Sequence, residues 1–495
     1  MKVTHTENLR PADLKSETER LWVYNGLDCC VTLEVLEALL PQLDNLTGGT
    51  YALSRALQAP VMEMNLRGVL IDERERQRAI DSFTSDTERL ERNLYLIVHD
   101  GVGYTDFRNT GRIRAWRSNS LVAILLYDIL KLPEIRKRNA TGQLVRTVNR
   151  DALERLQIHF IAQPIIGHIL ALRDFGKKIG VLETKIDSDG RLRTSYNIAG
   201  TTTGRFSSSL NDFGTGGNLQ NIEERLRRIV IADAGMKFAN VDLEQADSRN
   251  IGALCWNVFR DGKYLDACES GDLHTTVAKM SRPDLPWTNS LREDRRIAEQ
   301  PYYRHHGLRH MCKMLGHGTN YLGSPFEMTK HTKIEQSVIK DFQALYFKTF
   351  PAIPRLHEWI QTQLIESGKL VTPLGRKRWF FGKRDERDTL KQAVAHMGQS
   401  MTADEMNNAM MNVWRLNTVQ LLLQGHDSLL MQYPEEREND IIPQILSAMR
   451  VPIELEGGRQ FVVPVEVQVG WNWGKASEDN PAGLSKWPDE RRHRN

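Results

Sequence analysis

Apolar residues recur at helical spacing in two stretches near the start of the chain. Between residues 17 and 43, the apolar positions that share this spacing are Leu21, Tyr24, Leu27, Val31, Val35, Leu36 and Leu39. Pro41 closes the pattern, because proline has no backbone N–H to donate. A second pattern runs from Ala52 to Leu66 and stops at Gly68. Both stretches are predicted to be helices.

The pattern changes twice further along the chain. Residues 73–185 are rich in charge and helical in period, with a polar interruption between Gly101 and Ser120. From about residue 191, short strand-like runs alternate with turns rich in Gly and Ser. The tail after about residue 476 has little apolar content and is predicted to fray. The chain is therefore predicted to be a multidomain protein that mixes helices and strands.

Length and charge limit the class of protein. A chain of 495 residues is too long for one compact core and predicts about two to four domains or subdomains. The net charge is only +3, so any contact with nucleic acid must come from local basic clusters. The candidates are Arg225, Arg227, Arg228, Arg376, Lys377, Arg378, Lys383 and Arg384. Such runs are also typical of solvated faces, and that alternative stays open.

The five cysteines form neither a zinc-binding pattern nor a disulfide framework. Cys29 and Cys30 are adjacent, while Cys255, Cys268 and Cys312 are scattered. This usage predicts a reducing compartment. The sequence has no apolar run of about eighteen residues and no signal-peptide pattern, so a soluble intracellular protein without membrane contact is expected.

Two aspartates far apart in the chain each follow a strand-like apolar run. Asp242 ends Lys-Phe-Ala-Asn-Val-Asp, and Asp427 ends Leu-Leu-Leu-Gln-Gly-His-Asp. An ionised carboxylate at the edge of a core needs a hydrogen bond, a counter-charge or a cation. Two that converge repel each other, and Mg²⁺ shared with substrate phosphates relieves that repulsion. Taken alone, each aspartate is more typical of a strand end or turn than of catalysis.

Four side chains between Arg309 and Tyr321 are spaced by four, and the two between them are Lys313 and His317. In a helix they lie along one slowly drifting stripe about 18 Å long. That length is comparable to a nucleoside triphosphate with the base pair it joins. Arg and Lys suit the polyphosphate, and aromatic rings suit the base. The alternative is an exposed basic helix face with Tyr321 in the core.

Motifs in a consistent order resemble those of the family A DNA polymerases, the group similar to DNA polymerase I. The three main motifs are DLEQADSR from Asp242, RHMCKMLGHGTNYLG from Arg309 and LQGHDSLL from Leu423. Supporting stretches are TTTGRFSSS from Thr201, GNLQNI from Gly217, GDLHT from Gly271, TPLGRKR from Thr372 and GWNWGKA from Gly470. The resemblance runs from about residue 17 to about residue 476 and is similar to phage-type members.

The resemblance implies a multidomain α/β (α+β) right-hand polymerase fold, with an antiparallel-sheet palm, helical fingers and a helical thumb. The implied boundaries are 1–50 for an exonuclease remnant, 51–190 for the thumb, 191–255 and 391–480 for the palm, 256–390 for the fingers, and 481–495 for a flexible tail. It implies a DNA-directed DNA polymerase acting on primer-template DNA and dNTPs, with two Mg²⁺ ions or Mn²⁺ as a substitute. A cytoplasmic location follows, in the bacterial host if the protein is phage-encoded.

Site residues follow from the same resemblance, position by position. Asp242 and Asp427, with the backbone carbonyl of Leu243, match the metal ligands, and Lys313 matches a catalytic, triphosphate-binding position. The other matches to nucleotide contacts are Gln245, Asp247, His274, Arg309, His317 and Tyr321. The matches to primer or template contacts are Arg205, Asn218, Gln220, Asn221, Thr372, Arg376, Gln399 and His426. Contacts of this kind in the minor groove test pairing shape without reading sequence.

Several positions depart from the family's commonest pattern. Asp247 stands where a Glu usually walls off the sugar 2′ position, and its side chain is one methylene shorter. The sugar gate is therefore expected to be looser, or the backbone to shift. Ser428 replaces a common auxiliary Glu, which Glu244 is placed to supply. The remaining departures, at His317, Leu322 and Ala395, leave the metal ligands in place.

The stretch from Tyr24 to Asp28 resembles the last active-site motif of a proofreading 3′-to-5′ exonuclease. In that motif Tyr orients water and Asp binds metal. Only 23 residues precede Tyr24, too few for the earlier carboxylate motifs. The hypothesis is that this chain does not proofread alone and works with a separate exonuclease subunit or a processivity factor. Residues 17–43 would then be an exposed interface or a folded-back remnant, or alternatively a helix packed on the thumb.

Two other functions compete with the DNA polymerase. A single-subunit RNA polymerase has a related palm and fingers, and the short Asp247 favours it. Arg205, Gln399 and the thumb-like region favour the DNA polymerase. A non-catalytic DNA-binding clamp would need neither Asp242 nor its partner Asp427.

Overall fold

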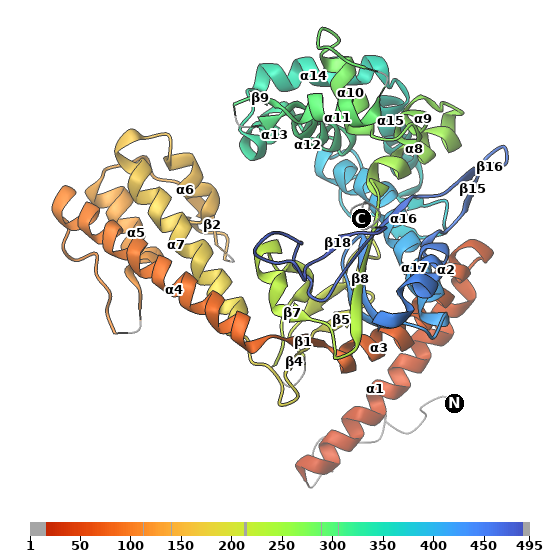
Figure 1. The fold of residues 1–495 in the computed structure, drawn as a ribbon, viewed down its shortest axis with the longest axis horizontal. Coiled ribbons are helices and arrows are strands. Elements are labelled where there is room, and N and C mark those ends of the chain that lie inside the picture. The colour runs from red at the N-terminus through yellow and green to blue at the C-terminus, as the bar shows by residue number, and fades with distance from the viewer. Residues whose placement is uncertain are drawn as a thin grey trace.

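The computed structural model describes residues 16–111, 113–139, 141–211, 215–288, 290–304 and 306–488, without the side chains of Leu46 and Asn221. Residues 1–15 of the expected exonuclease remnant and residues 489–495 of the expected tail lie outside these ranges. Figure 1 shows a central sheet, a layer of helices above it, a helical arm to one side and a single projecting helix near the N-terminus. Within the described ranges, every helix is too short or too polar to span a bilayer.

A five-stranded antiparallel sheet lies at the centre of the molecule (Figure 1). Its strands, in spatial order, are β13 (Gln420–Gln424), β14 (Ser428–Pro434), β8 (Met236–Leu243), β17 (Val465–Gly470) and β18 (Ser485–Lys486). Successive residues of a strand point to opposite faces. Ala239 and Val241 of β8 therefore enter one core, whereas Phe238 enters another. The expected antiparallel sheet in a mixed helix and strand fold is confirmed.

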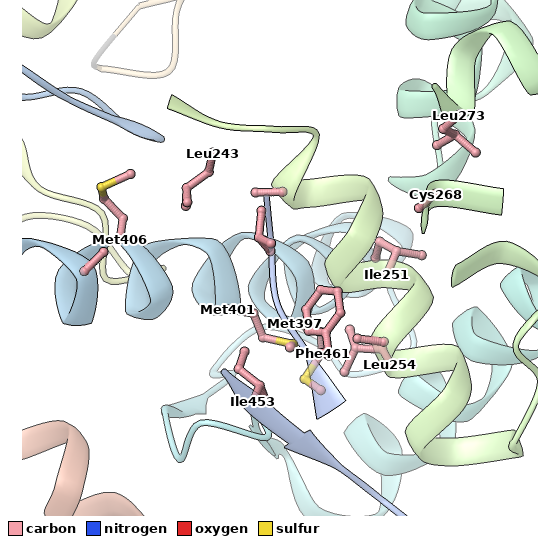
Figure 2. Packing of buried hydrophobic residues seen from close by; sticks show 14 of the residues in the cluster. Leu243, Ile251, Leu254, Cys268, Leu273, Met397, Met401, Met406, Ile453 and Phe461 are labelled. Carbon is pink, nitrogen blue, oxygen red and sulfur yellow. The ribbon is translucent and has the colours of Figure 1, made fainter. Parts of the chain in front are cut away.

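Helices on one face of the sheet form the largest core. They include α8 (Ala246–Phe259), α16 (Arg387–Arg415) and α17 (Glu438–Met449), with the hairpin of β15 (Ile453–Leu455) and β16 (Arg459–Phe461). Figure 2 shows Met397 and Met401 of α16 beside Leu254 of α8 and Phe461. Flexible methionine side chains fit such irregular gaps. α16 buries residues on all its sides, so its sequence lacks a single apolar stripe.

A layer of helices follows α8 in the chain and lies above the sheet in Figure 1. Its helices are α9 (Lys263–Glu269), α10 (Leu273–Ser281), α11 (Leu291–Glu299), α12 (Leu308–Asn320), α13 (Pro325–Thr332), α14 (Gln336–Thr349) and α15 (Ala352–Ser367). Two hairpins accompany them, β9 (Pro301–Tyr303) with β10 (His306–Gly307) and β11 (Lys369–Val371) with β12 (Lys377–Trp379). Asp272, Ser290 and Ser324 cap α10, α11 and α13 by accepting backbone N–H bonds, which fixes where these helices begin.

The helical arm has a core of its own. It contains α4 (Glu73–Leu96), α5 (Asn119–Ala123), α6 (Arg150–Leu156) and α7 (Gln163–Leu182), with the exposed hairpin of β2 (Arg136–Arg138) and β3 (Leu144–Arg146). Its buried side chains lie between Leu94 and Leu172 and form a cluster separate from the others. A third cluster joins the bases of α4 and α7 to the underside of the central sheet. The small strands β1 (Val69–Ile71), β4 (Arg191–Leu192) and β7 (Val230–Ile231) pair there, and β5 (Ser195–Asn197) pairs with β6 (Ser207–Ser209) nearby.

The segment before the arm divides into an exposed and a packed part. α1 (Glu17–Leu39) starts at a capping box made by Ser16 and Glu19, and none of its residues is buried. It projects away from the rest of the chain in Figure 1, so it does not pack on the arm. α2 (Asn45–Ala56) and α3 (Gln58–Arg67) follow, and Val61 and Met64 enter the largest core. The predicted thumb range of 51–190 is thus shared between separate cores.

The segment from residue 481 that was expected to be flexible contains a paired strand. β18 pairs with β17 at the edge of the central sheet, and Leu484 is only 6% exposed. Backbone hydrogen bonds hold this strand, so its low apolar content did not reveal it.

Glu91 is the polar centre of the arm. It is 6% exposed and accepts hydrogen bonds from Trp116, Asn109 and Tyr95, and it pairs with Arg114 at 2.9 Å. Glu91→Ala should destabilise the arm by about 3 kcal/mol, because four donors lose a buried partner. Hydrogen exchange of peptides from residues 90–172 measures this change.

The matched control is Glu88→Ala on the same helix, whose side chain is 59% exposed. It should change the protection of the arm by less than about 0.5 kcal/mol. Equal protection in both variants would contradict a central role for Glu91.

Candidate active site

The pairing of β8 with β14 brings the two predicted metal-binding aspartates together. Asp242 is in register with Ser428, the residue after Asp427, and the backbone N–H of Leu243 donates to the Asp427 carbonyl at 2.9 Å. Asp427 lies in the tight turn between β13 and β14, where the N–H of Gly425 donates to the Ser428 carbonyl. In this antiparallel pair β8 ends where β14 begins, so both carboxylates are held at the same end of the two strands.

A third carboxylate lies on the other side of Asp242. Glu466 of β17 is in register with Asp242, and its side chain pairs with Lys486 at 3.0 Å. Solvent reaches the Asp242 side chain, but surrounding protein and the charges of Asp427 and Glu466 raise the pKa of Asp242 to about 7. The ammonium group of Lys313 opposes this rise. The carboxylates at these strand ends therefore carry more negative charge than the neighbouring lysines balance.

These oxygens fit a hard divalent cation. Mg²⁺ is usually held by one or two carboxylates and takes its other ligands from water and substrate phosphates. No group of three or more His, Cys, Asp or Glu side chains in metal-binding geometry occurs in the described parts of the chain. Asp242 and Asp427, with the carbonyl of Leu243, supply oxygen atoms of the kind that such a cation prefers.

Helix α12 carries the predicted stripe of side chains from Arg309 to Tyr321, which lies near the strand ends that hold the two aspartates. Lys313 and His317 are exposed, while Leu308, Met311 and Leu315 are buried on the opposite face. Tyr321 is the residue that ends the helix, and its ring centroid lies 4.9 Å from that of His317. Among the described residues, Lys313 takes part in no ion pair. The spacing by four thus places the ammonium group of Lys313, which forms no ion pair in the described structure, one turn before the neighbouring rings of His317 and Tyr321.

Arg309 is held more firmly than the sequence suggested. Its guanidinium donates to Asp272 at 2.6 and 3.2 Å. Asp272 also caps α10 and accepts a bond from Thr275 at 2.8 Å. His274, in the first turn of α10, is 7% exposed. A triphosphate that contacts Arg309 must therefore share its guanidinium with Asp272.

Asp247 and Gln245 lie at the start of α8. Gln245 has φ 55°, a left-handed conformation, and precedes the first turn of the helix. Asp247 pairs with Arg205 at 3.3 Å and accepts a bond from Thr402 of α16 at 2.7 Å. Thr402 was missed by the sequence reasoning, because its link to Asp247 spans 155 residues of chain.

The predicted DNA-contacting residues are only partly open to a ligand. His426 is exposed beside Asp427, and Gln399 is partly exposed on α16. Asn218 accepts bonds from Ser208 and Gln220, and Gln220 donates to Gln424. The side chain of Asn221 lies outside what the structure describes.

Thr372 and Arg376 tie a loop to α16. Thr372 is 1% exposed and accepts the backbone N–H of Arg376, whose guanidinium pairs with the buried Asp404 at 2.6 Å. The same guanidinium packs against Gly204, which has φ +82°, and a Cβ there would lie 2.4 Å from Arg376 Cζ. Only glycine allows this approach, which places Arg205 next to the loop.

The chain belongs to DNA polymerase family A, whose model matches residues 107–475. Similar proteins include the thermostable DNA polymerase I of Thermus thermophilus, 27% identical over 447 residues, which are 85% of this chain and 47% of that protein. DNA polymerase I of Treponema pallidum is 25% identical over 91% of this chain and 43% of its own length. DNA polymerase I of Mycobacterium bovis is 29% identical over 72% of this chain and 38% of its own length. The chain spans about half the length, or less, of these curated relatives.

A solved structure shares the fold. It is the POL domain of Pol1 from M. smegmatis in complex with DNA primer-template and dNTP, with a TM-score of 0.66 and 24% identity. The match covers 84% of this chain and 69% of that one. The resemblance to family A is therefore confirmed. A phage-type origin stays a prediction, because the relatives named above are bacterial.

His274 should make the fold sensitive to acid. Burial disfavours its charged ring, and with the repulsion of Arg309 and Lys313 this lowers the pKa of His274 to about 4, against the attraction of Asp272. An unfolded histidine, with a pKa of about 6.5, binds its proton first, so stability falls as the pH drops from about 6.5 to about 4. His274→Gln should remove up to about 3 kcal/mol of that loss. Urea unfolding at pH 7 and pH 4.5 measures it.

The control for this experiment is His331→Gln, at an exposed position of α13. Its loss of stability between the two pH values should equal that of the unaltered protein. A His274→Gln protein that loses as much stability as the control would refute the argument.

Proposed function

We propose that this chain is a template-directed DNA polymerase, which adds a deoxynucleotide to a primer 3′-hydroxyl and releases pyrophosphate. The observation that carries the proposal is the pairing of β8 and β14, which sets Asp242 beside Asp427 within electrostatic reach of Lys313. Membership of DNA polymerase family A supports the same activity. Primer-template DNA and dNTPs are the substrates it implies.

The two aspartates and the Leu243 carbonyl would hold two Mg²⁺ ions, for which Mn²⁺ is a substitute. When bound, the ions lower the pKa of the primer hydroxyl and stabilise the charge of the leaving pyrophosphate. Asp242 and Asp427 act as ligands and not as general bases. Desolvation and, after it, the charge of Asp427 raise the pKa of Asp242, and this supports the role because a bound cation would offset both effects.

Helix α12 and its neighbours would bind the incoming nucleotide. Lys313 and Arg309 attract the triphosphate, and His274, uncharged at neutral pH, donates a hydrogen bond to it. The rings of His317 and Tyr321 offer apolar faces to the base. The residues next to the sugar would be Asp247 and Gln245, at the start of α8. Phosphate, base and sugar would then meet different elements.

The DNA would be held on the palm side of the same site. Arg205 and Gln399 would contact the primer terminus and the minor groove, with His426 beside the metal-binding turn. Asn218, Gln220 and Asn221 would position the template backbone. Thr372 and Arg376 would act through their loop, since Asp404 holds the Arg376 guanidinium. Backbone contacts of this kind position DNA without specifying its sequence.

Primer extension with Mg²⁺ tests the proposed activity. Asp427→Asn removes one charged ligand while keeping the size of the side chain, so extension should fall at least about a thousandfold. Asp385→Asn, at an exposed position on the surface, is the control and should extend the primer normally. Unchanged extension by Asp427→Asn would refute the metal-site assignment.

We further propose that Asp28 does not support proofreading in this chain. It lies on the exposed helix α1, outside any group of three metal-binding side chains among the described residues. Tyr24 is 61% exposed on the same helix. A separate exonuclease subunit or a processivity factor that binds α1 would fit these positions.

A primer with a mismatched 3′ end tests this proposal. Incubated with the purified chain and Mg²⁺ but without dNTPs, the primer should keep its length, since one exposed carboxylate cannot hold a nuclease metal centre. Shortening that Asp28→Ala abolishes would show that the proposal is wrong.

A further inference from the structure

Several buried polar atoms that lack a hydrogen-bond partner lie near Asp247. Among the described residues, those near Asp247 with a buried side-chain atom that lacks a hydrogen-bond partner include Arg205 (Nε), Gln245 (Oε1), Asn250 (Oδ1), Tyr321 (Oη) and Glu405 (Oε1). Native structures contain few such atoms, and each asks for an explanation. Glu405 is 2% exposed, and burial raises the pKa of its carboxyl to about 8. The region is therefore a buried polar network rather than an apolar contact between helices.

The hydrogen bonds of this network lead from Asn250 through Thr402 to Asp247. The Nδ2 group of Asn250 donates to Glu405 Oε2 and to Thr402 Oγ1, each at 3.1 Å. Thr402 has a single hydroxyl proton, so it accepts from Asn250 and donates onward. Its distance to Asp247 Oδ1 is 2.7 Å, against 3.5 Å to the Gly398 carbonyl. The shorter bond to a charged acceptor is the stronger one, so the proton points at Asp247.

Asp247 is thereby held where three elements meet. Its carboxylate is in the first turn of α8, it accepts from Thr402 of α16, and it pairs with Arg205 at 3.3 Å. The charge of Asp247 also acts on His317 and Tyr321 at the end of α12. The side chain of aspartate is one methylene shorter than that of glutamate and therefore reaches less far. If it were not held by a hydrogen bond, a small rotation would move its oxygens away from α12.

We propose that Thr402 is a positioning residue, which holds the Asp247 carboxylate against the sugar of the incoming nucleotide and so sets the choice between deoxyribose and ribose. This inference rests on the proposed polymerase function. Asn250 orients Thr402 by donating to its oxygen, and Glu405 holds the second proton of the Asn250 amide. The network thus acts on the substrate only through Asp247.

A cross-link that merely joins α8 to α16 would behave differently. Loss of such a link would lower the melting temperature and affect both kinds of nucleotide alike. Loss of a positioning residue changes the ratio of kcat/KM for dNTP and rNTP, because only one of the two sugars carries a 2′-hydroxyl.

The test compares single-nucleotide incorporation of dNTP and rNTP on one primed template. Thr402→Val keeps the shape of the side chain and removes the donor. The preference for dNTP should fall about tenfold, mainly through a lower KM for rNTP, while kcat for dNTP stays within about twofold. Thr402→Ser, which restores the hydroxyl, should restore the preference. Thr402→Ala provides a second variant if valine prevents folding, and melting curves are recorded for each protein.

A matched control lies on the phosphate side of the same site. Thr275 is 2% exposed and donates to Asp272, which pairs with Arg309 just as Asp247 pairs with Arg205. Thr275→Val should weaken dNTP and rNTP equally and leave their ratio unchanged.

An unchanged ratio in both Thr402→Val and Thr402→Ala, a Thr402→Ser protein that behaves like the valine variant, or an equal shift in Thr275→Val would each overturn the inference. Failure of the polymerase proposal is distinguishable, since the unaltered protein would then incorporate neither nucleotide.

Discussion

The register between β8 and β14 is the constraint on which the site depends. It places Asp242 of β8 beside Asp427, in the turn that leads into β14, and a one-residue slip would turn the side chain of Asp242 to the opposite face. Apolar residues on both faces of these strands prevent that slip, because Phe238 and Leu430 belong to one core and Val241 and Leu429 to another. Burial on both sides of the sheet therefore keeps the two carboxylates close together despite their repulsion.

The helices around this edge divide the charged groups into separate tasks. Arg309 is held by Asp272, and Arg205 by Asp247, so each guanidinium has a fixed direction. Lys313 alone stays open among these cations in the described structure. Charge pairs of this kind restrict the motion of the side chains and so fix the directions of their charged groups, which the proposed binding of phosphate, sugar and base would require.

The sequence indicated much of the site because its signals are local. The spacing of Lys313 and His317 and the strand ends at Asp242 and Asp427 depend on neighbouring residues only. The Thr402 network could not be predicted, since it joins residues more than 150 positions apart through the packing of α8 on α16. Likewise, the pairing of Arg309 with Asp272 and the edge strand at 485–486 depend on tertiary contacts that no periodicity reports.

The separate core of the arm gives the molecule a mechanical property. α4 and α7 pack along each other and run from the arm's core to the cluster beneath the central sheet. They form a stiff two-helix lever, and α4, with 24 residues, is about 36 Å long. A rotation of about 10° at the base would carry the far end through about 6 Å. Such a rotation would move the arm as one body, because the side chains of its own core would keep their neighbours.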